Sequence, residues 1–426
     1  MWFHAKAYLA VLMLRFRIDV IKGGQFLAMR FYLLLLYLLT TELAHAFGPS
    51  SFRFSTKPGP YTVGFRVAYQ YDNSRTYNAL TDVNGTLANK SGARPLQTLI
   101  WYPAHLAPRA SAMTYGDYLS LFVSEDSFTL TSSEAASVLK KNLHDYQVDA
   151  DPQARMRAIK DAPTQRGKFP LVIYAPSFSG PAFENADICE YLASYGYIVM
   201  ASPSIGADSF DMTGGIPGAE TQAKDISFEI GFSSSIPEVD SSHIAVLGYS
   251  WGGLSNFFAA AKDDRIKALL AFDGSARYFP SLLSKSGYVQ PKDMTIPMLF
   301  FTRGEIPLEE LVGADVSASV LNEMAHSDVY IVRMHNMRHG EFDSMKQRSP
   351  AYWTRHPSAE YSPEETSESY NWVGRYTLAF LDWTFRQDQH AHQFLTNSPA
   401  ANGVPGHMLA VQFNPKKEDQ PSTQKP

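Results

Sequence analysis

The chain has 426 residues, 45% hydrophobic and 13% aromatic, enough to bury a large core in one big domain or two smaller ones. Its formal net charge of −5 and its dispersed charged residues lack the basic footprint of nucleic-acid binding, so we expect no nucleic-acid partner. The single cysteine, Cys189, excludes a disulfide within the chain, and its surroundings predict a buried thiol on a helix.

The N-terminal segment has the pattern of an export signal. From Met29, a basic start leads into an apolar run and then into "AHA", which predicts signal-peptidase cleavage before Phe47. The apolar run is short for a bilayer span. We therefore expect residues 1–46 to be a signal peptide, with translation starting at Met1 or at Met29. The mature protein is then expected to be periplasmic or extracellular, without a stable membrane span. An uncleaved membrane anchor is the alternative.

The chain after the signal begins with strands and then changes character. β-branched and aromatic residues predict strands over 59–72 and 95–105. Residues 107–167 form a helical insertion, with helices predicted over 114–124, 132–147 and 151–162.

From residue 169 onward, apolar strands alternate with helices. Such a rhythm predicts a mostly parallel sheet covered on both faces, within a domain over 47–412. The polar, proline-bearing residues 413–426 predict a disordered tail. Strands are predicted over 169–177, 197–204, 243–250, 266–274, 295–304 and 328–336, and helices over 184–196, 219–232, 252–262, 307–325 and 370–387.

The stretch "GYSWG", residues 248–252, fits the pattern G-x-S-x-G and lies between a predicted strand and a predicted helix. In the sharp turn of a nucleophile elbow, a side chain at Gly248 or Gly252 would clash with neighbouring backbone, so both positions require glycine. The turn lifts the hydroxyl of Ser250 above the carboxyl edge of the sheet, where ligands bind in open α/β folds. The pattern predicts that Ser250 is a nucleophile.

A serine nucleophile needs a base, and in this fold the histidine follows the serine and the acid in the chain. His339 is the best candidate because it lies in a loop just beyond the last predicted strand, and His335 is the reserve. The spacing of these two histidines would suit two metal ligands on a helix, but the local pattern is strand and loop without H-E-x-x-H, so we expect no metal and no cofactor. His390, His392 and His407 are predicted surface residues.

Two residues are candidates for the acid that orients the base. Asp273 and Glu305 each end a predicted strand, and spacing alone does not choose between them. For the oxyanion hole, the fold supplies the amide of Trp251 and one from the loop after residue 175, where Phe178 is the candidate donor.

These motifs together resemble the α/β-hydrolase superfamily and, more narrowly, bacterial dienelactone-hydrolase-like proteins related to the platelet-activating-factor acetylhydrolases. The resemblance covers residues 59–412 and is carried by "FPLVIYAPSFSG", "GYSWGG", "ALLAFDG", "PMLFFTRGE" and "MRHGEFD", in that order. In the acetylhydrolase branch the acid lies 23 residues after the serine, which implies Asp273, and the histidine of H-x-x-F falls on His339.

Two positions depart from that family. The oxyanion loop often contains His-Gly, whereas this chain has Pro176 and Ser177. Dienelactone hydrolases proper use a cysteine nucleophile where this chain has Ser250, so the resemblance does not imply dienelactone as the substrate.

The expected function is that of a secreted serine hydrolase of carboxylic esters, acting on a small-molecule or lipid-like substrate, with short-chain or acetyl esters favoured. The aromatic residues Tyr115, Tyr118 and Phe122 form either a cap over an acyl pocket or the packing of the insertion onto the domain. Two other functions remain open, a prolyl-oligopeptidase-like peptidase and an inactive hydrolase fold that binds a ligand. Too few residues precede the catalytic region for the β-propeller of the peptidases.

Overall fold

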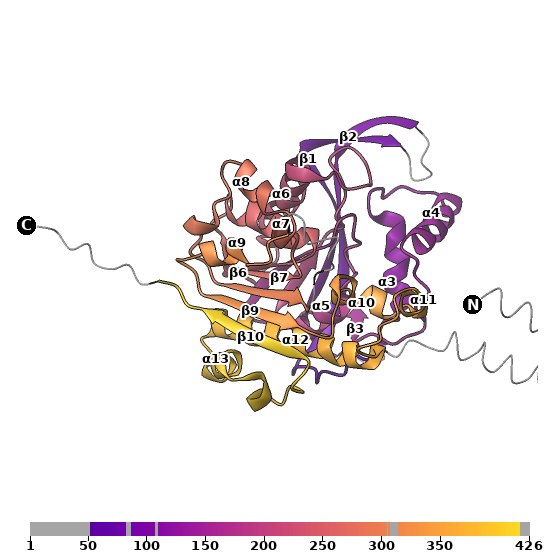
Figure 1. Ribbon diagram of the computed structural model, residues 1–426. Helices are drawn as coiled ribbons and strands as arrows, with labels where there is room; N and C mark the ends of the chain where they lie inside the picture. The colour runs from indigo at the N-terminus through magenta and orange to yellow at the C-terminus, as the bar shows by residue number, and fades with distance from the viewer. Residues whose placement is uncertain (1–51, 82–86, 107–109, 305, 307–313, 418–426) are drawn as a thin grey trace, which may run out of the picture. The chain divides into compact units, whose positions relative to one another are not determined.

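A mixed sheet runs through the part of the chain that the computed structural model describes, which is residues 52–81, 87–106, 110–304, 306 and 314–417. These residues belong to one compact unit, Ser50–Pro426. The predicted signal peptide, residues 1–46, lies outside the described residues. Within them the sheet has ten strands in the order β10-β9-β8-β7-β6-β4-β5-β2-β1-β3 (Figure 1).

The central strands, from β5 through β4, β6, β7 and β8 to β9, are parallel to one another, whereas β2 pairs with β5 and β10 pairs with β9 in the antiparallel sense. The strands are β1 Thr62–Thr81, β2 Leu87–Ala104, β3 Ala158–Lys160, β4 Phe169–Ala175, β5 Ile198–Ala201, β6 Val239–Tyr249, β7 Ile266–Phe272, β8 Met298–Arg303, β9 Val329–Met334 and β10 Leu409–Asn414.

Helices cover both faces of this sheet, as the alternation predicted. The α-helices are α3 Tyr115–Leu119, α4 Ser132–Asp145, α5 Ala186–Ser194, α6 Gly215–Ser233, α7 Trp251–Ala260, α8 Pro280–Lys285, α9 Ser319–Glu323, α10 Ser344–Gln347, α11 Pro350–Arg355, α12 Pro363–Arg386 and α13 Gln389–Thr396. The 3₁₀ helices are η1 Ser120–Ser124, η2 Ser275–Arg277, η3 Pro291–Asp293, η5 His339–Phe342 and η6 Pro399–Asn402.

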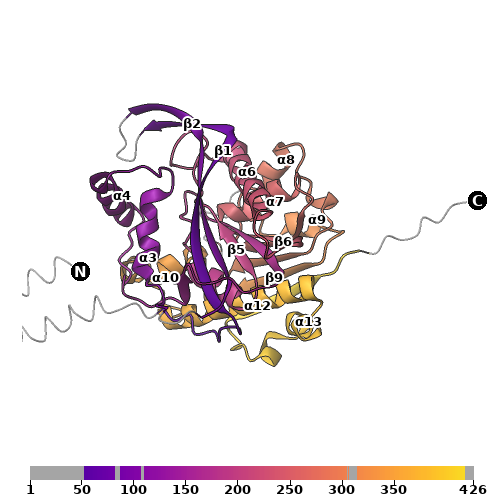
Figure 2. The ribbon, with the colours of Figure 1, turned by 180° about the vertical axis from the view of Figure 1, so that it is seen from behind.

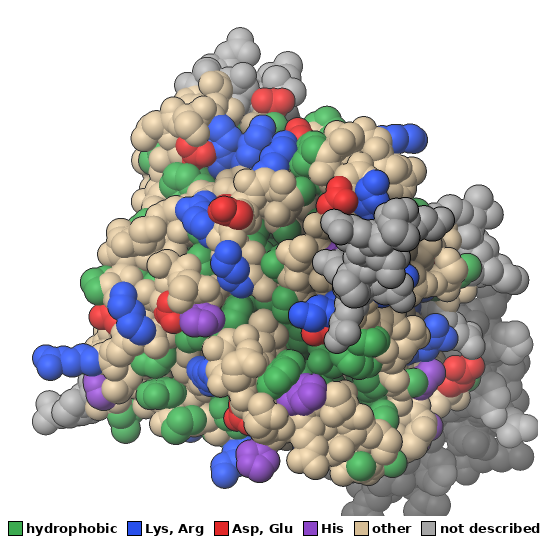
Figure 3. Space-filling view, turned by 90° about the vertical axis from the view of Figure 1, so that its left-hand side faces the viewer, with side chains coloured by type: hydrophobic (Ala, Val, Ile, Leu, Met, Phe, Trp, Pro, Cys, Tyr) green, Lys and Arg blue, Asp and Glu red, His purple; other side chains and the backbone are tan. Residues whose placement is uncertain are grey.

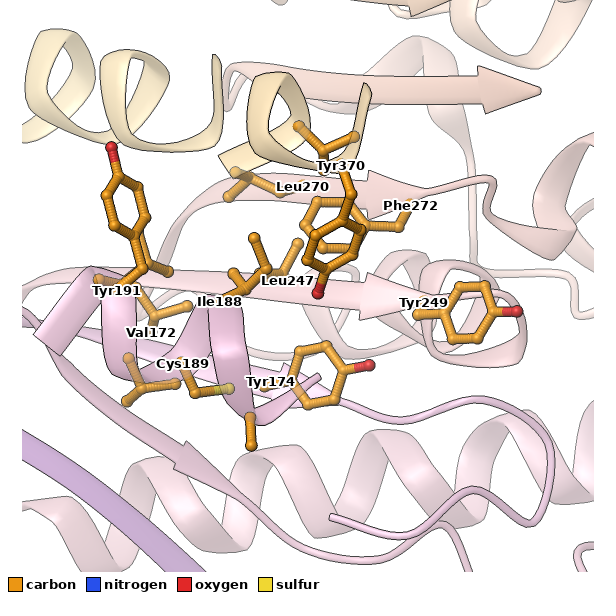
Figure 4. Close-up of a cluster of buried hydrophobic side chains, with 14 of the residues drawn as sticks. Val172, Tyr174, Ile188, Cys189, Tyr191, Leu247, Tyr249, Leu270, Phe272 and Tyr370 are labelled. Atoms are coloured by element: carbon orange, nitrogen blue, oxygen red, sulfur yellow. The ribbon is translucent and has the colours of Figure 1, made fainter. Parts of the chain in front are cut away.

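The core divides into two layers because successive side chains of a strand point to opposite faces. In β4, Val172 and Tyr174 belong to the cluster that includes α5 and α12, and Leu171 and Ile173 belong to the cluster that includes α6 and α7. Figures 1 and 2 show these two pairs of helices on opposite sides of the strands. In Figure 4, the labelled side chains of β4, β6 and β7 face those of α5 and Tyr370 of α12. Cys189 is fully buried on α5, as predicted.

The helix ends follow ordinary capping chemistry. Ser362 precedes α12 and accepts a hydrogen bond from the Glu365 amide, while the Glu365 carboxylate accepts one from the Ser362 amide. Thr131 and Glu134 make the same reciprocal pair at the start of α4, within the helix predicted over 132–147.

The chain reverses direction across the sheet at β4. From β4 it passes to β5 on one side, and it then returns through α6 to β6 on the other side. Ligands of open α/β sheets bind outside the carboxyl ends of the strands at such a point. The segments that follow β4, β6, β7 and β9 therefore meet at one edge, with Ser250 and His339 among them.

Two predicted elements were wrong, and of the helix predicted over 307–325 the described part is helical only in α9, Ser319–Glu323. The helix over 151–162 is instead a series of turns and the short strand β3, which pairs in parallel with Val63–Phe65 of β1. Residues 158–160 form an edge strand because the backbone N–H and C=O groups of β1 are available for pairing there. The periodicity of residues 151–162 does not reveal this distant partner. The predicted disordered tail was also wrong at its start, because β10 continues to Asn414 and Phe413 stacks on Tyr330 with ring centroids 4.5 Å apart.

Basic and acidic side chains are interspersed on the face of the molecule that Figure 3 presents. Across the residues that the structure describes, no helix has both the length and the apolar character needed to cross a bilayer.

Candidate active site

The predicted elbow is present between β6 and α7. Ser250 has φ 53° and ψ −112°, a left-handed φ that costs energy in a residue with a side chain. A Cβ on Gly248 would lie 2.2 Å from the Gly252 carbonyl carbon, and one on Gly252 would lie 2.0 Å from the Ala175 oxygen. The two glycines therefore permit the close backbone contacts that hold this turn.

Three side chains from distant parts of the chain form one hydrogen-bonded row. The Nε2 atom of His339 lies 2.8 Å from Oγ of Ser250, and its Nδ1 atom lies 2.6 Å from Oδ2 of Asp273. Because ionised Asp273 can only accept, Nδ1 carries the proton and Nε2 is left to accept the serine hydroxyl proton. This is the geometry that nucleophile, base and orienting acid require.

Asp273 is fully buried and has several donors around it. Burial raises its pKa, but the hydrogen bond from His339 and the positive charge of Arg303 outweigh burial and hold the pKa of Asp273 below its usual range. The hydroxyl of Tyr278 donates to both carboxylate oxygens, at 3.0 and 2.9 Å, and the Arg303 amide donates at 3.2 Å. The carboxylate therefore stays ionised at neutral pH.

The segment that carries His339 is fixed from two sides. η5 begins at His339, and the Arg338 guanidinium pairs with the buried carboxylate of Glu341, which also accepts the Arg338 amide at 2.8 Å. The hydroxyl of Tyr249, next to the elbow serine, donates to the His339 carbonyl at 3.0 Å. The imidazole is thus held by its own loop and by the strand that presents Ser250.

The two candidate oxyanion donors adjoin each other. The ring of Phe178 meets that of Trp251 edge to face, with centroids 5.3 Å apart. Trp251 is the first residue of α7, and the first amides of a helix have no partner within it. The Phe178 amide makes no hydrogen bond to any residue that the structure describes. Both amides are available to a ligand.

A pocket of about 750 Å³ opens beside Ser250 and His339, and its wall includes Phe178, Trp251 and Phe279. Of these, Phe178 and Phe279 are 46% and 48% exposed, so aromatic side chains line the entrance. The aromatic residues of the insertion do not line this pocket. Tyr115, Tyr118 and Phe122 are buried in the core, where they pack against residues such as Phe183, so their role is packing rather than a cap over the pocket.

The structure does not bring the other described candidates into this row. Glu305 falls outside the described residues. His335 follows β9, is exposed, and bonds through its amide to the Met408 carbonyl. Among the residues with described positions, no group of three or more His, Cys, Asp or Glu side chains could hold a metal ion. His390 and His407 are exposed, and His392 stacks on Trp383.

Sequence reasoning missed the residues that support the row. Tyr278 lies five positions beyond Asp273, directly after the 3₁₀ helix η2, and belongs to no recognisable motif. Glu184 lies in the turn that precedes α5, and its buried carboxyl binds the loop that carries Phe178. No local pattern marks either role, because each depends on the fold around it.

The comparisons agree with this architecture. The model of the dienelactone hydrolase family matches residues 156–331. A protein of Methylorubrum extorquens named as a carboxymethylenebutenolidase is 24% identical over 149 residues, 32% of this chain and 48% of its own length, so the chain spans about half of that relative. A cutinase of Thermobifida alba is 22% identical over 244 residues, 56% of this chain and 68% of its own.

A solved structure has the same fold. The ferulic acid esterase from Streptomyces cinnamoneus superimposes with a TM-score of 0.58 at 18% identity, over 84% of this chain and 98% of its own. The parallel sheet and this likeness show an α/β-hydrolase fold, and the part of the chain over 156–331 is similar to the dienelactone hydrolase family.

Proposed function

We propose that the protein is a serine hydrolase of carboxylic esters, with short-chain or acetyl esters as favoured substrates. The observation that carries the proposal is the single row of hydrogen bonds from Ser250 through His339 to Asp273. The names of two relatives, a cutinase and a ferulic acid esterase, describe proteins that act on esters, and they support the same class of reaction.

In the proposed mechanism, Ser250 Oγ attacks the acyl carbonyl while His339 Nε2 takes the hydroxyl proton. The carbonyl becomes a tetrahedral oxyanion, which the amides of Phe178 and Trp251 stabilise. The C–O bond to the alcohol then breaks, and His339 gives its proton to the leaving oxygen. Water attacks the acyl-enzyme by the same path in reverse, releasing the acid and free Ser250.

Asp273 stabilises the imidazolium that forms in each half of the reaction. The Oδ2 atom of Asp273 lies 2.6 Å from Nδ1 of His339. Because the carboxylate is buried and ionised, its negative charge is weakly screened and interacts strongly with the imidazolium. The aromatic wall formed by Phe178, Trp251 and Phe279 offers an apolar surface to the substrate.

The test is hydrolysis of p-nitrophenyl acetate by purified protein that lacks residues 1–46, with Ser250→Ala as the control. We expect turnover that the substitution abolishes, and a fluorophosphonate adduct on Ser250 in the native protein alone. Faster cleavage of an aminoacyl-proline amide than of any ester would favour the peptidase. No adduct and no turnover would favour a ligand-binding protein.

We also propose export, which rests on the signal pattern that ends before Phe47. Expression of the full chain in a bacterial host, followed by fractionation and N-terminal sequencing, tests it. We expect a periplasmic or extracellular product beginning at Phe47, whereas a full-length cytoplasmic product would overturn the proposal.

A further inference from the structure

The loop that carries Phe178 wraps around a buried carboxyl group. Glu184 is 1% exposed, and its Oε1 atom accepts hydrogen bonds from the Ser177 amide and the Tyr174 hydroxyl, both at 2.7 Å. Its Oε2 atom lies 2.6 Å from Oγ of Ser177. A Cβ on Gly180 would lie 2.6 Å from this same Oε2 atom, so the loop closes on the carboxyl group without room for a side chain.

Other parts of the fold hold the same loop. Ser179 has a left-handed φ of 54°, its carbonyl accepts the Tyr146 hydroxyl, and its Oγ accepts the Met212 amide at 2.9 Å. The residues on either side of Phe178 are therefore both fixed by polar contacts, while the side chain of Phe178 itself is exposed. The contacts fix the backbone of Phe178, which is the part the oxyanion would meet.

Glu184 also contacts the segment that follows His339. Its carbonyl accepts the Met345 amide at 3.1 Å and the Ser344 hydroxyl at 3.0 Å. One residue thus joins the candidate oxyanion loop, through its side chain, to the chain that carries the candidate base, through its backbone.

We propose that Glu184 is a positioning residue that holds the Phe178 amide where the oxyanion of the reaction forms. Its carboxyl group acts on Ser177 and touches no substrate. Losing this anchor frees the loop and removes one oxyanion donor, which in serine hydrolases lowers kcat by about 10²–10³-fold.

The protonation state of Glu184 suits this role. Burial and the negative charge of Asp343 raise the pKa of Glu184 to about 8. When neutral, the acid keeps all its contacts, because Oε1 still accepts and the proton on Oε2 is donated to the Ser177 hydroxyl. A glutamine side chain has the same arrangement of one acceptor and one donor group, so Glu184→Gln is a conservative replacement.

The kinetic test compares three variants with the native enzyme on p-nitrophenyl acetate. For Glu184→Ala we expect kcat to fall about 10²-fold or more with little change in KM, and for Glu184→Gln we expect kcat close to native. Glu190→Ala is the matched control, since Glu190 lies on α5, six residues after Glu184, and is equally buried, but its carboxyl group bonds to the Tyr118 hydroxyl and the Arg157 amide, away from the loop. A native kcat in Glu184→Ala, or an equal loss in Glu190→Ala or Glu184→Gln, would overturn the inference.

The kinetic test rests on the proposed function. A second measurement, amide hydrogen exchange, does not depend on catalytic activity. Amide hydrogen exchange of the peptide over 177–180 should be faster in Glu184→Ala than in the native protein, Glu184→Gln and Glu190→Ala, and equal exchange would overturn the inference. If the native protein hydrolyses no ester, the proposed function fails and hydrogen exchange still decides. If Glu184→Ala does not fold, Ser177→Ala replaces it: faster loop exchange supports the inference and native exchange overturns it.

Discussion

Replacing Gly252 with alanine places a methyl group where two backbone segments touch. The new Cβ would lie 2.0 Å from the Ala175 oxygen, and real Cβ atoms essentially never approach closer than 3.0 Å. The end of β4 and the start of α7 must therefore separate by at least 3.0 − 2.0 = 1.0 Å. These segments lead to the amides of Phe178 and Trp251, so the substitution pulls apart the two proposed oxyanion donors.

The expected losses follow from that separation. Overpacking of this kind costs about 1–3 kcal/mol of unfolding free energy, and a misplacement of about 1 Å at a reacting centre can lower the rate about a hundredfold. We expect Gly252→Ala to show both effects, measured by urea denaturation and by kcat on p-nitrophenyl acetate.

Gly231→Ala is the matched control. Gly231 lies near the end of α6, and a Cβ there meets nothing within 4 Å. Alanine should stabilise the helix by up to about 1 kcal/mol and leave kcat unchanged. If Gly252→Ala kept native stability and native kcat, the claim that the elbow depends on this contact would be refuted.

Three further predictions concern Asp273. Asp273→Asn should lower kcat about 10⁴-fold in ester hydrolysis, because an amide does not enforce the Nδ1–H tautomer of His339; a loss below tenfold would contradict its role. Tyr278→Phe removes a donor to a charged acceptor, so the free energy of unfolding should fall by about 1.5–3 kcal/mol in urea denaturation, and native stability would count against it. The pKa of Asp273 is lower in the folded protein than its value of 3.8 in the unfolded chain. The ionised carboxylate therefore stabilises the folded state fully at pH values above 3.8, and this contribution is lost as the pH falls through the pKa of the folded state. Stability measured between pH 7 and pH 2 should therefore fall less steeply in Asp273→Asn, and parallel curves would exclude this contribution.

Much of the fold was predictable because its signals are local. The parallel strands are buried on both faces, so they appear as continuous apolar runs, and the helices between them keep their own periodicity. The elbow was predictable for a similar reason, since the G-x-S-x-G pattern is local, and the crowding at Gly248 comes from Gly252 and Gly253 of the same turn, although that at Gly252 comes from Ala175. The edge strands β3 and β10 were missed because their pairing with β1 and β9 depends on distant partners.

The candidate site shows the same division. Chain order and the ends of the strands singled out Ser250 and His339 but left Asp273 and Glu305 open until the family resemblance favoured Asp273. The structure brings Asp273 within 2.6 Å of His339, while Glu305 lies outside the described residues.

Residue types, their spacing and their apolar rhythm were sufficient to derive a parallel α/β fold with a serine at its elbow. The contacts that join His339 and Asp273 to that serine, the Tyr278 donor, and the Glu184 carboxyl bound to the Phe178 loop emerged only from the folded chain. The physical reason is that a hydrogen bond depends on positions to within a few tenths of an ångström, and those positions are set by packing between distant segments, such as Ser250 and His339, which are 89 residues apart.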